Sequence, residues 1–340
     1  MPSLLTYGGS MSVLIQDAIN AAVPGDQIVV EAGTYHERLL IQKDGISLIG
    51  HNAVIEPPTD GDNNICTGLA GEDTQVGICV AGRDIELAAF VLEHRKVQSV
   101  RDTVEGVSII GFDVRNFVGC NVAVVGATNT RVTENKLSEG PVYGFLTVGS
   151  INTRFADNKV ASTNEMGFIG ACMDNFHGVD MLNNHVSGYQ YGICVQTSGA
   201  NVRGNDARNN CNSIFVDPDV HGAVISGNFI GPPNPKCTGP GSVGVHGISL
   251  VSAIDSRVEG NTVEGQRNAG QGVGISIIDE KCIEPALSCV TLGNQAPPAS
   301  GNVVVRNILR DNDIDLLLDT AGANTVSDNG QSAPNPIKLP

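Results

Sequence analysis

Asparagine recurs at one position of a short apolar and polar pattern that repeats along most of the chain. Each repeat has an apolar residue, two spacers, the asparagine, one spacer and a further small or apolar residue. These ladder asparagines are Asn135, Asn158, Asn184, Asn205, Asn228, Asn261, Asn307 and Asn329. Upstream, Phe90 and Phe112 occupy the same slot. Most neighbouring positions are 21 to 26 residues apart, an interval typical of stacked repeat proteins.

The short apolar alternations within each repeat predict strands and not helices. A single repeat is too short to bury its own apolar face, so the repeats must stack on one another. Stacked strands lie about 4.8 Å apart, which puts equivalent asparagines in one column where their amides can bond to each other. We therefore expect the ladder asparagines to point inward and to be buried.

A second strand is expected in each repeat, upstream of the asparagine strand. The predicted segments are residues 121–125, 144–148, 167–171, 192–196, 213–217, 247–251, 274–278 and 313–318. Alternation along residues 213–217 points Ile214 and Val216 inward and leaves Phe215 and Asp217 outward. The equivalent outward residues form one row, which we expect to be an exposed sheet face. This outward row also includes Cys194, Gln196, Ser249, Val251, Ser276, Ile278, Asp313 and Asp315.

Residues 12–22 place their apolar side chains on one face of a helix, which could cover the first edge of a stack of strands. The phrase IQDAINAAVPGDQIVVEAGTYHERLLIQKDGISLIG resembles the N-terminal start of right-handed parallel β-helix proteins of the pectin-lyase-like superfamily. The later repeats resemble the NosD-type and general β-helix members. The resemblance covers residues 12–329. It implies an all-β fold, a single-stranded right-handed parallel β-helix of about ten coils with a short N-terminal capping helix.

The period predicts one β-helix domain over residues 1–340, with coils over residues 27–329. The loop insertions that interrupt the period are residues 57–77, 231–242 and 279–300. The last two approach the same sheet from opposite edges and are expected to wall a groove over residues 192–278. The tail, residues 330–340, is expected to lie loose or to pack across the last coil.

The net charge and the composition limit the kinds of partner that this chain can bind. The formal net charge of −16 argues against a nucleic-acid partner. No apolar run approaches the roughly 18 residues of a membrane span. No basic and apolar leader is visible at the N-terminus, although a mature fragment with an added methionine would look the same. We expect a monomer and leave an oligomer open.

The nine cysteines give information about the cellular compartment of the protein. Cys282 and Cys289 lie close together in one insertion, and Cys66 and Cys79 bracket another loop, so both pairs are candidate disulfides. Cys172 and Cys194 occupy strand positions and are expected to be small buried hydrophobes. The odd count leaves at least one cysteine outside an internal disulfide. Disulfides would indicate a secreted, extracellular protein.

Acidic residues end several of the second strands. Asp217 and Asp219 follow one strand, Asp174 follows the strand two coils earlier, and Asp279 and Glu280 follow the strand two coils later. Paired carboxylates serve glycoside cleavage as acid and as base or nucleophile. The same kind of oxygen could instead hold Ca²⁺, for which the candidate ligands are Asp174, Asp279 and Glu280. The alternative is that these residues only cap turns.

Three histidines are candidate acid–base groups. His177 and His221 each stand seven residues before a ladder asparagine and next to strand-end carboxylates, although a turn residue before glycine would look the same. His246, in GVHG, resembles the Gly-His-Gly segment of polygalacturonase-type glycoside hydrolases, and Asp217 and Asp219 resemble the Asp pair of that family. The chain departs from the family where GICVQTS replaces an Asn-Thr-Asp segment and VGISII replaces an Arg-Ile-Lys segment.

Aromatic and polar residues near the same strands are candidates for binding a substrate. Tyr189 and Tyr191 stand at the start of the 192–196 strand, where a ring could stack on a sugar. The other candidates, from the outward row, are Gln196, Phe215, Ser249 and Ser276.

Together these features favour a carbohydrate-active enzyme that acts on a polysaccharide or oligosaccharide with Asp and His, with Ca²⁺ assistance left open. The superfamily resemblance implies lyases, hydrolases and epimerases of polysaccharides, so a lyase or epimerase and a glycoside hydrolase both stay open. It also implies non-catalytic relatives, so the first alternative is a carbohydrate-binding or structural β-helix. The second alternative is an isomerase or cyclase that acts on a small apolar molecule.

Overall fold

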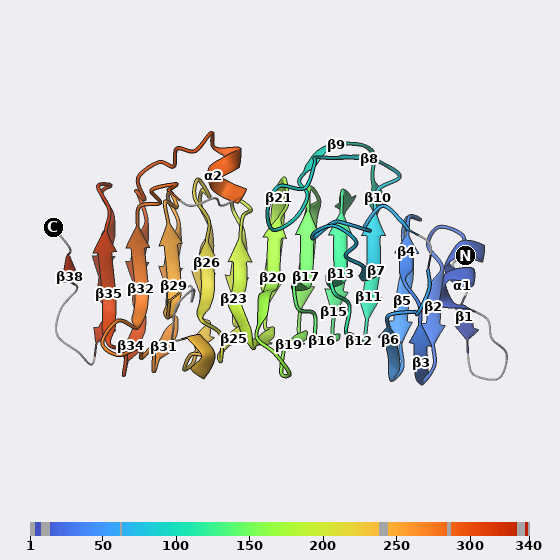
Figure 1. The fold of residues 1–340 in the computed structure, drawn as a ribbon, viewed down its shortest axis with the longest axis horizontal. Coiled ribbons are helices and arrows are strands. Elements are labelled where there is room, and N and C mark those ends of the chain that lie inside the picture. The colour runs from blue at the N-terminus through green and yellow to red at the C-terminus, as the bar shows by residue number, and fades with distance from the viewer. Residues whose placement is uncertain are drawn as a thin grey trace. The chain divides into compact units, whose positions relative to one another are not determined.

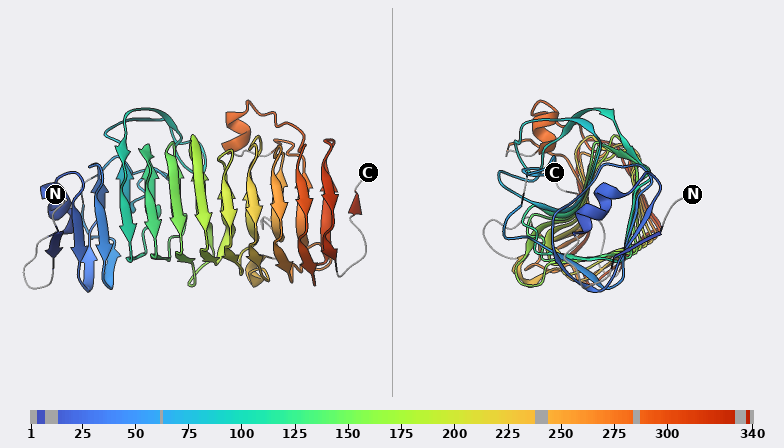
Figure 2. Two further views of the ribbon diagram at one scale, coloured as in Figure 1. Left: turned by 180° about the vertical axis from the view of Figure 1, so that it is seen from behind. Right: turned by 90° about the vertical axis from the view of Figure 1, so that its right-hand side faces the viewer.

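The chain winds into coils of three short strands, and equivalent strands of successive coils pair in parallel. The structure, a computed structural model, describes residues 4–7, 14–61, 63–237, 244–283, 287–331 and 337–338. The chain divides into two compact units. Unit 1 contains Met1–Glu165 and Asp174–Val179, and unit 2 contains Met166–Met173 and Asp180–Pro340. Each unit is built from parallel coils with a first, second and third sheet (Figures 1 and 2).

The strands of unit 1 are as follows. Its first sheet contains β1 (Leu4–Tyr7), β2 (Gln27–Val30), β5 (Ser47–Gly50), β11 (Ser108–Ile110), β15 (Arg131–Thr133) and β18 (Ile151–Ala156), with β10 (Val104–Glu105) and β14 (Ala127–Thr128) paired off this path. Its second sheet contains β3 (Gly33–His36), β6 (Ala53–Glu56), β12 (Asp113–Arg115), β16 (Lys136–Ser138) and β19 (Lys159–Ala161). Its third sheet contains β4 (Leu39–Ile41), β7 (Val76–Ala81), β13 (Cys120–Val125) and β17 (Tyr143–Val148).

Unit 2 repeats the arrangement. Its first sheet contains β24 (Asn201–Arg203), β27 (Val224–Ser226), β30 (Arg257–Glu259), β33 (Val303–Val305) and β36 (Thr325–Ser327), and β21 (His177–Leu182) has residues in both units. Its second sheet contains β22 (His185–Ser187), β25 (Asp206–Ala207), β28 (Phe229–Ile230), β31 (Thr262–Glu264), β34 (Ile308–Arg310) and β37 (Gly330–Gln331). Its third sheet contains β20 (Gly167–Asp174), β23 (Tyr189–Val195), β26 (Asn212–Val216), β29 (His246–Val251), β32 (Val273–Ile278), β35 (Ile314–Asp319) and β38 (Ile337–Lys338).

The ladder asparagines are buried, as predicted, except Asn329, which is half-buried. Those from Asn135 to Asn307 are at most 2% exposed. In unit 2, the Nδ2 and backbone N of Asn205 both donate to Oδ1 of Asn228, at 3.0 and 2.9 Å. In unit 1, the same two atoms of Asn135 donate to Oδ1 of Asn158, at 3.1 and 2.9 Å. Each inward amide therefore satisfies its neighbour, which is how a buried polar column is tolerated.

Phe112 holds the first ladder slot, but Phe90 does not. Phe112 is 1% exposed, and its backbone N donates to Oδ1 of Asn135 at 3.0 Å. Phe90 is 43% exposed and lies between β8 (Asp84–Leu87) and β9 (Val97–Asp102), an antiparallel hairpin that the period did not predict. The prediction for Phe90 was wrong because the apolar alternation of a hairpin looks the same in sequence as that of a coil.

The N-terminal capping helix is confirmed as α1 (Ile15–Ala21), which lies across the first coils of unit 1 (Figure 2). Ile15, Ala18 and Ile19 form its buried face. The Glu37 carboxylate accepts the backbone N–H groups of Ile15 and Gln16, at 2.9 and 3.0 Å. Glu37 thus satisfies donors that a helix N-terminus leaves without an intrahelical partner. Residues 12 and 13 of the predicted helix lie outside the described residues.

Disulfides fasten all three predicted insertions. The predicted pairs Cys66–Cys79 and Cys282–Cys289 are both formed. A third disulfide, Cys211–Cys237, joins the start of β26 to the 231–242 insertion and was not predicted. Cys120, Cys172 and Cys194 take part in no disulfide and are buried, as expected for the last two. The disulfides indicate an extracytoplasmic location.

The predicted tail contributes β38, whose Ile337 and Lys338 pair with Leu317 and Leu318 of β35. This part of the tail packs on the last coil, and residues 332–336 and 339–340 lie outside the described residues. Within the described part of the chain, no helix has the length and apolar character needed to cross a membrane.

Candidate functional site

The outward row of unit 2 is mostly buried, and the prediction of an exposed face was wrong for most of its members. Its buried members are Cys194, Asp217, Ser249, Val251, Ser276 and Asp315. The row contains many short side chains on strands about 4.8 Å apart, so longer neighbours shield them. Asn212 Nδ2 donates to Ser249 Oγ at 3.1 Å, and His246 Nδ1 lies 3.2 Å from Ser276 Oγ. Both longer side chains therefore lean across the serines.

Phe215 and Gln196 remain half-buried on this face, and Phe215 belongs to an aromatic cluster. The Tyr191 ring meets Phe168 and Phe215 edge to face, with ring centroids 5.8 and 5.2 Å apart. All three rings are partly accessible to solvent. In a chain with 4% aromatic residues and no tryptophan, three such rings in contact mark this place as unusual. We call Phe168, Tyr191 and Phe215 the aromatic cluster.

Tyr189 does not join this cluster. Its side chain is fully buried, so its prediction as a substrate-binding residue was wrong. The chain turns at Gly188, which has a φ of +88°, and enters β23 with the Tyr189 ring packed against the backbone of Gly170. A bulky side chain at Gly170 would collide with that ring. Ser249 and Ser276, at 1% and 0% exposure, are likewise closed to a substrate.

A chain of polar side chains lies beside the aromatic cluster. Ser249 Oγ accepts from Asn212 Nδ2 and from Ser276 Oγ, both at 3.1 Å, and Ser276 Oγ lies 3.2 Å from His246 Nδ1. We call these four residues the polar chain. Burial lowers the pKa of His246 to about 4, so its imidazole is neutral near pH 7.

Asp219 and His221 form an open pair in the turn after β26. His221 Nε2 lies 3.2 Å from Asp219 Oδ1, and the two side chains are 51% and 45% exposed. The preceding coil holds this turn in place, because the His221 backbone N donates to Ser198 Oγ at 3.0 Å. Asp217 is only 6% exposed, with Cys194 Sγ 3.9 Å from its Oδ2. The accessible acid–base groups of this turn are therefore Asp219 and His221.

His246 is not brought together with this turn. It pairs with Asn212 at the start of β26, whereas Asp217 follows the end of that strand. Five residues of extended chain span on the order of 16 Å. The predicted catalytic set therefore divides into His246 at one end of the strands and Asp217, Asp219 and His221 at the other.

Asp279 and Glu280 have structural partners. The Asp279 carboxylate accepts hydrogen bonds from Thr320 Oγ1 at 2.6 Å and from the backbone N of Ala321 and Ala299 at 2.8 Å. Burial alone would raise the pKa of Asp279, but these bonds hold it below its usual value. Asp279 thus anchors the point where the 279–300 insertion, which contains α2 (Leu287–Thr291), leaves and rejoins the coils.

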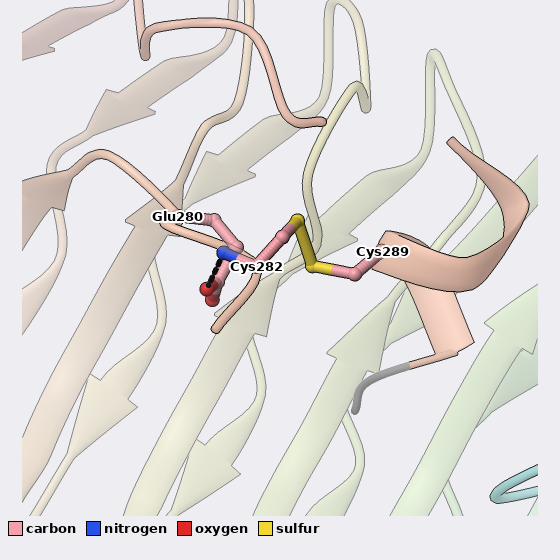
Figure 3. Close-up of side chains that lie close together, drawn as sticks. All are labelled: Glu280, Cys282 and Cys289. Atoms are coloured by element: carbon pink, nitrogen blue, oxygen red, sulfur yellow. Dashed lines mark hydrogen bonds between the residues drawn. A yellow bond between two sulfur atoms is a disulfide. The ribbon is translucent and has the colours of Figure 1, made fainter. Parts of the chain in front are cut away.

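Glu280 lies beside Cys282 and Cys289 (Figure 3), and ligand atoms of the three are within 4.8 Å of one another. The two sulfur atoms are joined in a disulfide, so they are not thiolate ligands. Glu280 Oε1 accepts the backbone N–H of Cys282 at 2.9 Å. This is the one such group among the described residues, and its chemistry does not suit a cation. Ca²⁺ binding by Asp174, Asp279 and Glu280 stays a prediction.

Asp174 and His177 belong to unit 1. Asp174 Oδ2 lies 2.9 Å from His94 Nε2 and 2.8 Å from Lys96 Nζ, and His94 Nδ1 lies 3.1 Å from Tyr143 Oη. Burial alone would raise the pKa of Asp174, but the hydrogen bond from His94 and the charge of Lys96 hold it below its usual value. The His177 side chain is exposed. We call Asp174, His94, Lys96 and Tyr143 the hairpin clamp, because His94 and Lys96 come from the β8–β9 hairpin.

Sequence reasoning missed His94, Lys96 and Tyr143. The available signal was the sequence His-Arg-Lys at residues 94–96, a basic run in a strongly acidic chain. Unit 1 also has a surface pocket of about 540 Å³ near the capping helix and the 57–77 insertion. Its polar lining includes Gln16, His36, Glu37, Arg38, Asp60 and Asn64.

Comparisons with known proteins bear on the fold. The family of periplasmic copper-binding proteins (NosD) matches residues 167–332, just under half of the chain. A search of curated proteins gave no match. PfbA, a surface adhesin of Streptococcus pneumoniae, is a similar solved structure at 14% identity and a TM-score of 0.57, with 93% of this chain and 85% of that chain covered.

Two epimerase structures are also similar. The periplasmic alginate epimerase AlgG has 12% identity and a TM-score of 0.56, with 99% of this chain and 85% of that chain covered. The AlgE4 A-module, a mannuronan C-5 epimerase of Azotobacter vinelandii, has 13% identity and a TM-score of 0.51, with 96% and 94% covered. The chain is a right-handed parallel β-helix with the pectin-lyase-like fold. This confirms the predicted fold class, and at these identities the likeness shows the β-helix fold alone. One domain over residues 1–340 stays a prediction.

Proposed function

We propose that this β-helix is a carbohydrate-active protein that binds a polysaccharide along the third sheet of unit 2. The observation that carries the proposal is the aromatic cluster of Phe168, Tyr191 and Phe215, whose rings are partly exposed and in which Tyr191 contacts both phenylalanines. Aromatic rings with one accessible face bind the apolar face of a sugar at a low cost in side-chain entropy. The similar structures, which include a periplasmic alginate epimerase, a mannuronan C-5 epimerase and a surface adhesin, support a polysaccharide or cell-surface ligand outside the cytoplasm.

The same face also supports a second proposal, that the protein catalyses a reaction on the bound polysaccharide. Asp219 and His221 lie 3.2 Å apart and open to solvent, beyond the strand that carries Phe215. A histidine beside a carboxylate can take a proton from a reacting group and return it. This pair is the proposed acid–base group of a lyase, an epimerase or a glycoside hydrolase, and a secreted protein is the proposed setting.

Binding is tested with a panel of polysaccharides by affinity electrophoresis and calorimetry. Tyr191→Ala and Phe215→Ala should each weaken binding about tenfold, because the loss of one stacking ring removes roughly 1–1.5 kcal/mol. Phe176→Ala is the matched control, since Phe176 is an exposed ring of unit 1. Polysaccharide binding that ignores Tyr191 and Phe215 but responds to Phe176 would place the binding face in unit 1 instead.

Catalysis is tested separately on any polysaccharide that binds. His221→Ala and Asp219→Asn should abolish turnover without loss of binding. An unsaturated, ultraviolet-absorbing product marks a lyase, new reducing ends without it mark a hydrolase, and an inverted uronic acid marks an epimerase. If a bound polysaccharide is left unchanged by the wild-type protein, the non-catalytic reading holds.

A further inference from the structure

We infer that the unit 2 face recognises a neutral polysaccharide, whose hydroxyl groups donate hydrogen bonds to His246 and Asn212 beside the rings of Tyr191 and Phe215. This inference rests on the proposed polysaccharide binding and specifies its substrate class. Two features of the unit 2 face carry it: the hydrogen-bond acceptors that the polar chain leaves without a partner, and the charges around them.

The rings and the polar chain occupy neighbouring positions on the same strands. Tyr191 pairs with Asn212, and Asn212 pairs with His246. Phe215 pairs with Ser249 of the polar chain. Paired residues of adjacent strands are about 4.8 Å apart, which is close to the width of one sugar ring. A sugar stacked on the cluster therefore lies within reach of the polar chain.

The hydrogen bonds of the polar chain have a direction. Ser276 Oγ donates to Ser249 Oγ, so the Ser276 oxygen is left to accept the Nδ1–H of His246. A neutral imidazole with its proton on Nδ1 presents a lone pair on Nε2. Burial lowers the pKa of His246 to about 4, which keeps the ring in this neutral form near pH 7.

Asn212, like His246, uses its donor within the polar chain and is left with an acceptor. Its Nδ2 is used by Ser249, and its Oδ1 is buried without a hydrogen-bond partner in a side chain that is 4% exposed. A buried acceptor in that state costs about 1–3 kcal/mol until a donor reaches it. Both atoms that the polar chain leaves without a hydrogen bond among the described residues, His246 Nε2 and Asn212 Oδ1, are acceptors. A hydroxyl can donate to them, whereas the carboxylate of a uronic acid cannot.

The charges around this face also favour a neutral ligand. The described strands β23, β26, β29 and β32 contain no lysine or arginine. Five of the six arginines of unit 2 are held in ion pairs, for example Arg208 with Asp206 at 2.7 Å, and the sixth, Arg203, donates to Ser226 Oγ. The carboxylates that follow these strands are Asp217, Asp219, Asp279 and Glu280. A polyanion would meet negative charge here, and the net charge of −16 would add to the repulsion.

The test compares neutral glucans, mannans and xylans with alginate and polygalacturonate, by calorimetry at low and high salt. We expect a neutral polysaccharide to bind with an affinity that salt leaves unchanged. His246→Phe keeps a ring but removes the acceptor, and should weaken that binding about tenfold, the equivalent of one hydrogen bond. His185→Phe is the matched control, because His185 lies on β22 of the second sheet.

Ser276→Ala is the second variant, a smaller change that should weaken binding severalfold by releasing the orientation of His246. It keeps the test decisive if thermal unfolding shows that His246→Phe does not fold. Binding of alginate or polygalacturonate that depends on Tyr191 would overturn the neutral class while leaving the proposed function standing. If both variants bind a neutral polysaccharide as tightly as the wild type does, the proposed hydroxyl contacts are wrong. If no polysaccharide binds, the proposed function fails and the inference fails with it.

Discussion

A buried histidine of unit 1 and a half-buried histidine of unit 2 have different roles. In unit 1, His94 lies between Tyr143 and Asp174, and Lys96 bonds to the same carboxylate. In unit 2, His246 bonds to the Ser276 hydroxyl and has no charged group acting on its pKa. His94 uses both ring nitrogens within unit 1, whereas the polar chain uses only Nδ1 of His246.

The difference is one of partners and not of burial alone. The hairpin clamp combines charges that offset the cost of taking Asp174 out of water, so it fastens the β8–β9 hairpin. The polar chain is neutral, holds the His246 ring in one orientation and leaves one nitrogen for a ligand. A buried histidine therefore indicates a site only when its hydrogen bonds do not already use both nitrogens.

The largest expected effect comes from the clamp. Asp174→Ala leaves Lys96 and His94 without their carboxylate and should lower the free energy of unfolding by about 3–5 kcal/mol. Urea unfolding measures it. Asp219→Ala, on an exposed side chain, is the control and should change the free energy of unfolding by about 0.5 kcal/mol or less. Equal urea midpoints for the two variants would show that the clamp does not stabilise unit 1.

The next effect is a pH dependence that separates the two histidines. The folded pKa of His246 is about 4 against 6.5 for the ordinary side chain. As pH falls from 6.5 to 4 the unfolded chain gains a proton that the folded chain does not, so stability falls by up to about 3 kcal/mol. The lowered pKa of Asp174 acts below this window, because stability from a depressed carboxyl is lost only as pH falls through the acid range.

His246→Gln should flatten the loss of stability between pH 6.5 and pH 4 when urea unfolding is followed across this range. Asp174→Asn should leave the slope in that window as it is in the wild type. A slope that persists in His246→Gln would assign the proton uptake to another group.

The asparagine ladder should respond equally in both units. Asn205→Leu in unit 2 and Asn158→Leu in unit 1 each leave neighbouring amides without partners in a buried column, and should each cost about 1–3 kcal/mol. Thermal unfolding of the two variants checks the value. A cost in one unit alone would show that the two ladders are not equivalent.

The smallest effect on stability is expected at the open pair. His221→Ala should change the free energy of unfolding by less than about 1 kcal/mol, because both partners are about half exposed. On a bound polysaccharide the same variant should remove turnover. A large loss of stability would mean that His221 is a structural turn residue, as the alternative interpretation of the sequence held.

The sequence predicted what depends on local periodicity. The coil strands, the capping helix and the buried asparagines follow from patterns that neighbouring repeats share. The accessibility of the outward row did not follow, because Asn212 and His246 shield Ser249 and Ser276 from adjacent coils. The Cys211–Cys237 disulfide and the His94–Asp174 contact join residues 26 and 80 positions apart, and no repeated pattern connects them.

The site could be predicted only in part. Phe215 and Gln196 lie at the accessible outward positions that alternation assigned to them, and Tyr191 is accessible at the start of its strand. Asp219 and His221 form the expected pair. The direction of the hydrogen bonds among Asn212, Ser249, Ser276 and His246 could not be predicted, because it depends on how side chains from three coils lean over the sheet.

The most direct measurement is a crystal structure of the protein with a neutral oligosaccharide from the binding panel. We predict a sugar ring against Tyr191 and Phe215, with one hydroxyl within hydrogen-bond distance of His246 Nε2. An oligosaccharide seated in the unit 1 pocket near Arg38 and Asn64, with the aromatic cluster empty, would contradict polysaccharide binding on the third sheet of unit 2.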